Sequence, residues 1–197
     1  MSVLLLALAC AVPSEAVLED SDTPSEPEPV AGTVVMLDAQ SGDPRTDVTL
    51  TSLSGEIVDT ESGEGTVQLL PGDFVVTATA DDARDHRLVG IAGNEDFTLL
   101  SYMSNRTLTD QVMGMLARAA DPAKAFLVVG VDHPDLSPAV GASVNIDAPH
   151  DVAFVLGNSG PREGQEITSS VGGFVTFANV TPGPVVVTVT PPEGETC

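Results

Sequence analysis

Tryptophan is absent from this chain of 197 residues, and tyrosine and lysine occur once each, as Tyr102 and Lys124. The chain has 7 Lys and Arg residues against 29 Asp and Glu residues, so its formal net charge is −22. Nucleic acid is not an expected partner, because binding phosphates needs clustered basic side chains that release counterions. The two cysteines, Cys10 and Cys197, are too few for a disulfide framework and match no zinc motif. We assign Cys197 no role.

The sequence patterns of common catalytic sites are also missing, among them GxSxG, HExxH, the P-loop and the dinucleotide-binding glycines. Catalysis at neutral pH usually needs a histidine held beside a partner. His86, His133 and His150 each stand next to an aspartate in a predicted turn, and adjacency in sequence does not aim an imidazole at a nucleophile. We therefore predict solvated loop histidines, no catalytic residue and no enzymatic activity.

Carboxylates are the one metal-ligating group that is plentiful, and calcium prefers oxygen ligands. Asp81, Asp82 and Asp85 follow one predicted strand, and Asp132 and Asp135 lie in another predicted turn. Neither group has the twelve-residue spacing of an EF-hand loop. We expect solvated carboxylates at strand ends, and we predict no metal and no cofactor.

Residues 1–9 (MSVLLLALA) form an apolar run that is too short to span a bilayer and has the length of a signal-peptide core. The end of this run, Leu8-Ala9-Cys10, resembles the lipobox of bacterial lipoproteins. The resemblance implies that residues 1–9 are a signal peptide and that Cys10 is acylated and becomes the new N-terminus. The alternative is ordinary signal cleavage farther along, for example after Ala16, which would discard Cys10. Under either interpretation the mature protein lies outside the cytoplasm.

Residues 11–29 carry six acidic side chains and no basic one. Self-repulsion and proline keep such a segment extended, and it lacks the apolar surface that would offset the entropy of ordering. We predict that residues 10–30 form an acidic disordered tether that holds a folded body away from a membrane. The alternative is a disordered tail without that role.

From residue 30 onward, short apolar runs alternate with turn residues, which is typical of half-buried strands. A first set of strands is predicted at residues 32–38, 47–53, 55–60 and 65–80, the last with a hairpin at Pro71-Gly72. The same order returns at residues 126–132, 139–146, 152–156 and 173–190, after a polar loop at 157–166, with Pro182-Gly183 as the second Pro-Gly turn.

Valine-rich strands of this length must bury one face, and two small sheets packed face to face are the usual solution. The first core is predicted to contain Val67, Leu69, Phe74 and Val76. The second core is predicted to contain Val144, Phe154, Phe177, Val185, Val187 and Val189.

Both sets of strands resemble the carboxypeptidase regulatory-like domain, a transthyretin-like (prealbumin-like) β-sandwich of about seven strands. Residues 138–144 (PAVGASV) match the Pro-x-x-Gly-Ala-x-Val strand of that family. Gly173, Phe177 and the Pro182-Gly183 turn match most of its Pro-Gly segment, and the first set is a more degenerate copy. In the family the zinc ligands belong to a separate catalytic domain, so the resemblance implies an accessory module without its enzyme.

Residues 101–125 have a different, helical period. The predicted stripe consists of Leu108, Val112, Met115, Leu116 and Ala119. Thr107-x-x-Asp110 has the form of a capping box, and Asp121-Pro122 ends the run. We predict a helix of three to four turns that packs on one module or bridges both; the alternative is a partner-binding face.

These patterns together predict an all-β chain of two tandem Ig-like or prealbumin-like β-sandwiches, residues 31–98 and 123–197, joined by a helical connector at 99–122. The expected function is that of a non-enzymatic protein with a structural or protein-binding role, as a scaffold or adhesin. The lipid anchor would hold it in the bacterial cell envelope, at the outer membrane. A carbohydrate-binding module is one alternative, although few aromatic residues are present to stack on sugars. A hydrolase is another, and it would need histidines, or a histidine and carboxylates, to converge in one pocket.

Overall fold

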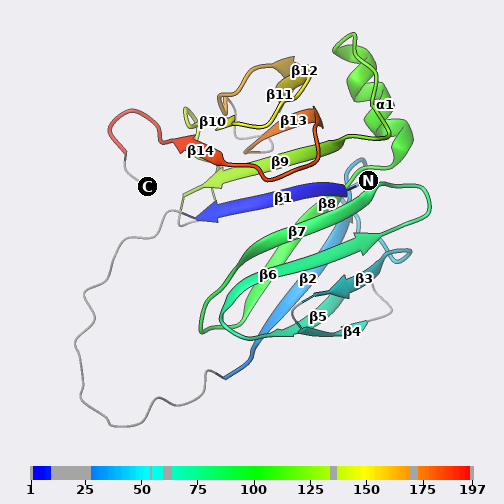
Figure 1. The fold of residues 1–197 in the computed structure, drawn as a ribbon, viewed down its shortest axis with the longest axis vertical. Helices are drawn as coiled ribbons and strands as arrows, with labels where there is room; N and C mark the ends of the chain where they lie inside the picture. Colours follow the sequence, from blue (N-terminus) through cyan, green and yellow to red (C-terminus); the bar gives the residue numbers. More distant parts are fainter. Residues whose placement is uncertain are drawn as a thin grey trace.

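The computed structural model describes residues 2–9, 28–53, 55–59, 64–133, 137–168 and 173–195, and for residues 2–9 and 55–59 it describes the backbone alone. Within these ranges the chain forms fourteen β-strands and one short α-helix (Figure 1). The prediction of a mostly β protein with a single short helix is therefore confirmed for the described residues. The predicted tether lies outside them, except for its last residues, and Val30 is already the first residue of a strand.

The strands of the first half of the chain are β1 (Ser2–Ala9), β2 (Val30–Asp38), β3 (Thr49–Ser52), β4 (Gly55–Asp59), β5 (Glu64–Leu69), β6 (Gly72–Thr79), β7 (Asp85–Ala92) and β8 (Phe97–Met103). The helix and the remaining strands are α1 (Arg106–Met115), β9 (Ala125–Asp132), β10 (Ser143–Ile146), β11 (Val152–Gly157), β12 (Gly160–Glu163), β13 (Phe174–Val180) and β14 (Val187–Thr190).

Three sheets result from the pairing of these strands. The largest has eight strands in the order β12-β11-β13-β9-β1-β7-β6-β3, a second has the order β4-β5-β2-β8, and β10 pairs with β14. In the large sheet, β1 runs parallel to both of its neighbours, β7 and β9 (Figure 1). The segment predicted to be a signal peptide thus coincides with the strand at which the two halves of the chain meet.

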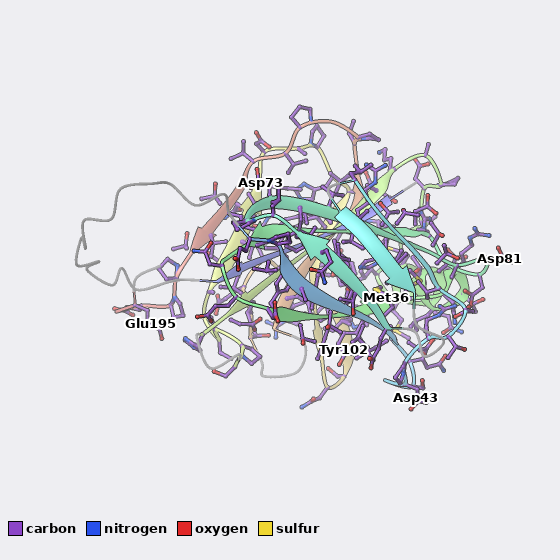
Figure 2. The ribbon with its side chains drawn as sticks, turned by 90° about the horizontal axis from the view of Figure 1, so that it is seen from below. Met36, Asp43, Asp73, Asp81, Tyr102 and Glu195 are labelled. Carbon is purple, nitrogen blue, oxygen red and sulfur yellow. The ribbon has the colours of Figure 1, made fainter. Side chains whose placement is uncertain are left out.

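The first core lies between the β7-β6-β3 part of the large sheet and the four-stranded sheet. Met36 of β2 and Leu88 of β7 are almost wholly buried there, and Figure 2 shows Met36 inside the molecule. Full burial of one such side chain contributes about 2 kcal/mol. All four residues predicted for this core are buried: Val67, Leu69, Phe74 and Val76.

The second core involves both faces of the β9-β13-β11 part of the large sheet. One face packs against β10 and β14, and Val144 and Phe177 are wholly buried there, as predicted. The three predicted valines of residues 185–189 are partly buried against the same cluster. Phe154 is buried as well, but on the opposite face, in a cluster with Met113 and Leu116 beneath α1. The helix therefore packs on the second half, which is one of the roles predicted for it.

The predicted hairpin at Pro71-Gly72 is wrong. β5 pairs with β2 and β4, whereas the next strand, β6, pairs with β3 and β7, so Pro71-Gly72 carries the chain from one sheet to the other. Pro182-Gly183 does the same between β13 and β14. The reason is that Leu69 and Phe74 bury against one core from opposite sheets, so the two strands face each other across the core. Gly72 has a φ of 131°, which suits glycine at such a turn.

The start of α1 differs from the predicted capping box. The N-cap is Asn105, whose side-chain oxygen accepts the backbone N–H of Leu108 at 2.8 Å. Thr107 lies inside the helix. Asparagine is among the best N-cap residues, so this helix begins two residues before the position that the Thr-x-x-Asp spacing suggested.

The end of α1 also comes earlier than predicted. The last helical residue is Met115, and Ala117 has a φ of 53°, a left-handed conformation that turns the chain away before Asp121. Met115 is therefore 70% exposed and Ala119 is exposed, although both were placed on the buried stripe. Met113 is the wholly buried residue instead.

Four strands were not predicted: β1, which coincides with the expected signal peptide, and β7, β8 and β12. The expected end of the first module at residue 98 falls inside β8, which pairs in parallel with β2 along its length. β12 lies within the predicted polar loop 157–166. In β7, exposed charged residues such as Arg87, between buried His86 and Leu88, interrupt the apolar signal.

Candidate functional site

An open cleft of about 490 Å³ lies between the end of the first core and the segment around α1. Its lining residues are Ala83, Arg84, Asp85, Arg106, Asp110, Ala120 and Pro122. Charges of both signs therefore line its wall. Its position, between the two halves of the chain, makes it the first candidate for a binding site.

Arg84, one of the residues that line this cleft, forms its polar contacts with the protein itself. Nη1 of Arg84 donates to the carbonyl oxygens of Asp121 at 3.3 Å and Lys124 at 3.4 Å. The guanidinium also lies 5.2 Å from the ring centroid of Phe126, within the range of a cation–π contact. Arg84 thus links the strand connection before β7 to the segment between α1 and β9. The cleft therefore lies where these two segments meet.

A second arginine, which is buried, lies at the acidic end of the first half. Arg45 is 7% exposed, and its guanidinium donates to Asp47 at 2.9 Å and to Asp82 at 2.6 Å. The hydrogen bond from Arg45 lowers the pKa of Asp47 below its usual range, and the pKa of Arg45 is raised in turn. Figure 2 shows Asp43 and Asp81 at this same end of the molecule, far from Glu195. The arginine offsets the mutual repulsion of the carboxylates there.

His86 is the clearest correction to the predicted histidines. It lies in β7, is 4% exposed and has its Nε2 3.2 Å from the hydroxyl oxygen of Ser101, which is 1% exposed. The prediction of a solvated loop residue is therefore wrong for His86. Because burial disfavours the charged imidazolium, the pKa of His86 is lowered to about 4, and the ring is neutral at pH 7.

The His86–Ser101 pair combines a base and a hydroxyl, which are components of nucleophilic catalysis. Both side chains, however, are enclosed in the first core, where a substrate has no access. His86 belongs to the eight-stranded sheet and Ser101 to β8 of the four-stranded sheet. Their contact therefore joins the two sheets across the core and satisfies two buried polar groups.

The other two histidines have separate partners. His133 follows β9 and lies 3.5 Å from a carboxylate oxygen of Glu195. Nδ1 of His150 lies 3.0 Å from the carbonyl oxygen of Ala148, and the ring packs edge-on against Phe177 with 5.1 Å between the ring centroids. Each histidine thus contacts different groups, and the convergence that a hydrolase would need does not occur among them.

Asn179 forms a polar node between the second core and the segment after α1. It is 1% exposed and has a φ of 55°, at an irregularity in the pairing of β13 with β9. Its side-chain oxygen accepts the N–H of Asp121, and its amide nitrogen donates to the carbonyl of Ala119 and to the carboxylate of Asp151, all at 2.8 to 2.9 Å. The bond from Asn179 is also the main reason why the pKa of Asp151 is lowered.

Some of the carboxylates considered as metal ligands take part in these contacts, and others are exposed to solvent. Asp82 accepts from Arg45, and Asp132 ends β9, where burial raises its pKa. Asp135 and Cys10 lie outside the described residues, as does Cys197. In the ranges that the structure describes, no group of three or more His, Cys, Asp or Glu side chains is placed to hold a metal ion.

A scan against protein-family models found no match for this chain, and a search of curated proteins found none either. Among the described residues, no helix has both the length and the apolar character needed to cross a membrane.

Among the polar residues that tie elements together, the sequence analysis did not identify the roles of Arg45, His86 and Asn179. Two of them leave a signal in the sequence. Arg45 is the single basic residue before residue 84, and asparagine is a residue type depleted in strands, so Asn179 within an apolar run marks an irregularity. His86 leaves none, because its burial depends on which face of an unpredicted strand enters the core.

Proposed function

We propose that this chain is a non-enzymatic, lipid-anchored protein of the bacterial cell envelope, with a structural or protein-binding role. Its body would consist of two tandem Ig-like or prealbumin-like β-sandwiches connected by α1. The main support is that the buried or strongly bonded polar side chains hold one element against another. Arg45, His86 and Asn179 all do so, and none of them lines the open cleft.

The anchor would be Cys10, as the Leu8-Ala9-Cys10 sequence suggests. One acyl chain binds a membrane weakly, so stable anchoring requires the multiple acylation that bacterial lipoproteins carry. Between Cys10 and Glu28 there are 17 residues (27 − 10). Fully extended, they would span about 60 Å. Such a spacer would let the body reach partners beyond the lipid headgroups.

The protein-binding role is supported by the surface of β8. Within the described part of the chain, β8 is an edge of its sheet and pairs with β2 alone. Leu100 and Tyr102, on one face of this strand, are 59% and 55% exposed. An edge strand with exposed apolar side chains is a common place for a partner to bind.

The anchor is tested by fractionation of bacteria that express the wild-type chain, Cys10→Ser or Cys197→Ser. We expect wild type and Cys197→Ser in the membrane fraction and Cys10→Ser in the soluble fraction. Cys197→Ser is the matched control, because it removes the other thiol and leaves the lipobox intact. Equal membrane association of all three chains would contradict anchoring through Cys10.

A further inference from the structure

β1 makes every connection between the two halves of the chain within the eight-stranded sheet. It pairs with β7 from Ser2↔Asp85 to Leu6↔Val89, and with β9 from Val3↔Phe126 to Ala9↔Asp132. β7 and β9 do not pair with each other. Because both run parallel to β1, they are also parallel to each other (Figure 1).

Removal of residues 1–9 at the lipobox would leave two facing strand edges. β7 would keep β6 as its one neighbour, and β9 would keep β13. Strands in a sheet lie about 4.8 Å apart, so the two edges would be separated by roughly 10 Å, the width of one missing strand. Unpaired N–H and C=O groups on both edges would then face an opening that fits one extended segment.

We propose that this opening, the β7–β9 slot, binds an extended strand of a partner protein, in parallel orientation to both edges, after the leader has been removed. The proposal rests on the leader cleavage assigned under the proposed function. Binding by strand addition draws on main-chain hydrogen bonds, and the neighbouring side chains select the sequence.

The composition of the slot defines the partner strand. At its centre, Leu88 and Val89 of β7 lie opposite Val128 and Val129 of β9, so an uncharged aliphatic segment fits there. The chain's own segment, SVLLLALA, meets this description and has no proline. Its two ends pair with Asp85 and Asp132, which would favour basic residues on either side of the aliphatic part.

Before cleavage the slot is filled by the chain's own β1, and a second strand has no edge to pair with. Cleavage would therefore expose the facing edges of β7 and β9 for pairing with another strand. The same event that frees Cys10 for anchoring would open this binding site, so the unprocessed chain would not capture a partner strand in the β7–β9 slot.

The test compares residues 10–197 with the full chain, both carrying Cys10→Ser, by fluorescence anisotropy with a labelled SVLLLALA peptide flanked by two lysines at each end. We expect saturable binding to the shorter chain and at least tenfold weaker binding to the full chain. A peptide of equal charge with Leu5→Pro, which removes a ladder N–H, should bind at least tenfold more weakly. Equal binding of both peptides, or equal binding to both chains, would overturn the proposal.

Two further measurements test the slot independently of this comparison. The full-length chain with Leu5→Pro in its own β1 should also bind the wild-type peptide, since its slot is less firmly filled, and this covers the case in which the shorter chain fails to fold. Hydrogen exchange of residues 10–197 without peptide gives a further check. Protection of the backbone amides along the facing edges of β7 and β9 would overturn the proposal, because it would mean that the two strands pair with each other and the slot has closed. Acylation of Cys10 is measured separately, so failure of the anchor and failure of the slot are distinguishable.

Discussion

Acidification should destabilise the chain through His86. In the unfolded chain this histidine would titrate near its usual value of 6.5, whereas in the folded chain its pKa is about 4. At pH 7 both states hold the neutral ring. Between pH 6.5 and 4 the unfolded state binds a proton that the folded state does not bind, so stability falls as the pH falls. The two pKa values differ by about 2.5, and each pKa unit corresponds to about 1.4 kcal/mol, so the free energy of unfolding falls by about 3 kcal/mol between pH 7 and pH 4.

The assay is urea denaturation of wild type and His86→Gln at pH 7, 6, 5 and 4. The many carboxylates change stability over the same range, so the difference between the two proteins isolates the histidine. Glutamine retains a hydrogen-bonding group for Ser101 and does not titrate. We expect the stability advantage of wild type over the variant to shrink by about 3 kcal/mol between pH 7 and pH 4.

The matched control is His133→Gln, since His133 is partly exposed and lies beside Glu195. It measures what the same His→Gln replacement does at a site where the side chain is not buried. A constant difference between wild type and His86→Gln from pH 7 to pH 4 would refute the claim that a neutral histidine is buried between the two sheets.

Two further predictions concern single substitutions in the cores. Asn179→Ala should lower the free energy of unfolding by about 3 kcal/mol, because it leaves buried partners unsatisfied at a left-handed position, while Asn158→Ala in an exposed turn should change it by less than about 0.5 kcal/mol. Gly90→Ala should cost about 1 to 3 kcal/mol, because its Cβ would lie 2.8 Å from the Phe74 ring, whereas Gly93→Ala meets nothing within 4 Å. Chemical denaturation measures all four variants, and equal effects within either pair would contradict the packing described.

The sequence was sufficient for the strands that stand out as short apolar runs between turn residues. β2, β6, β9 and β13 were predicted on that basis, as were the core positions Val67 and Phe177. The pairing of the strands was not predictable, because an apolar run such as β5 or β6 buries one face equally well as a hairpin arm or across a core. Only the arrangement in space distinguishes the two.

The polar contacts were less predictable than the cores. His86 and His133 both stand beside an aspartate in the sequence, yet only His86 enters the core, because β7 directs alternate residues inward. The end of α1 likewise depends on the left-handed Ala117, a conformation that alanine rarely adopts without tertiary contacts. Local sequence therefore indicated which residue types were available and left their partners undetermined.

The most direct test of the account is the mass of the N-terminal peptide of the protein recovered from bacterial membranes. We expect a peptide that begins at Cys10 and carries a diacylglyceryl group and a further acyl chain. A peptide that still contains residues 2–9, with an unmodified Cys10, would contradict it and would leave β1 as a permanent strand of the sheet.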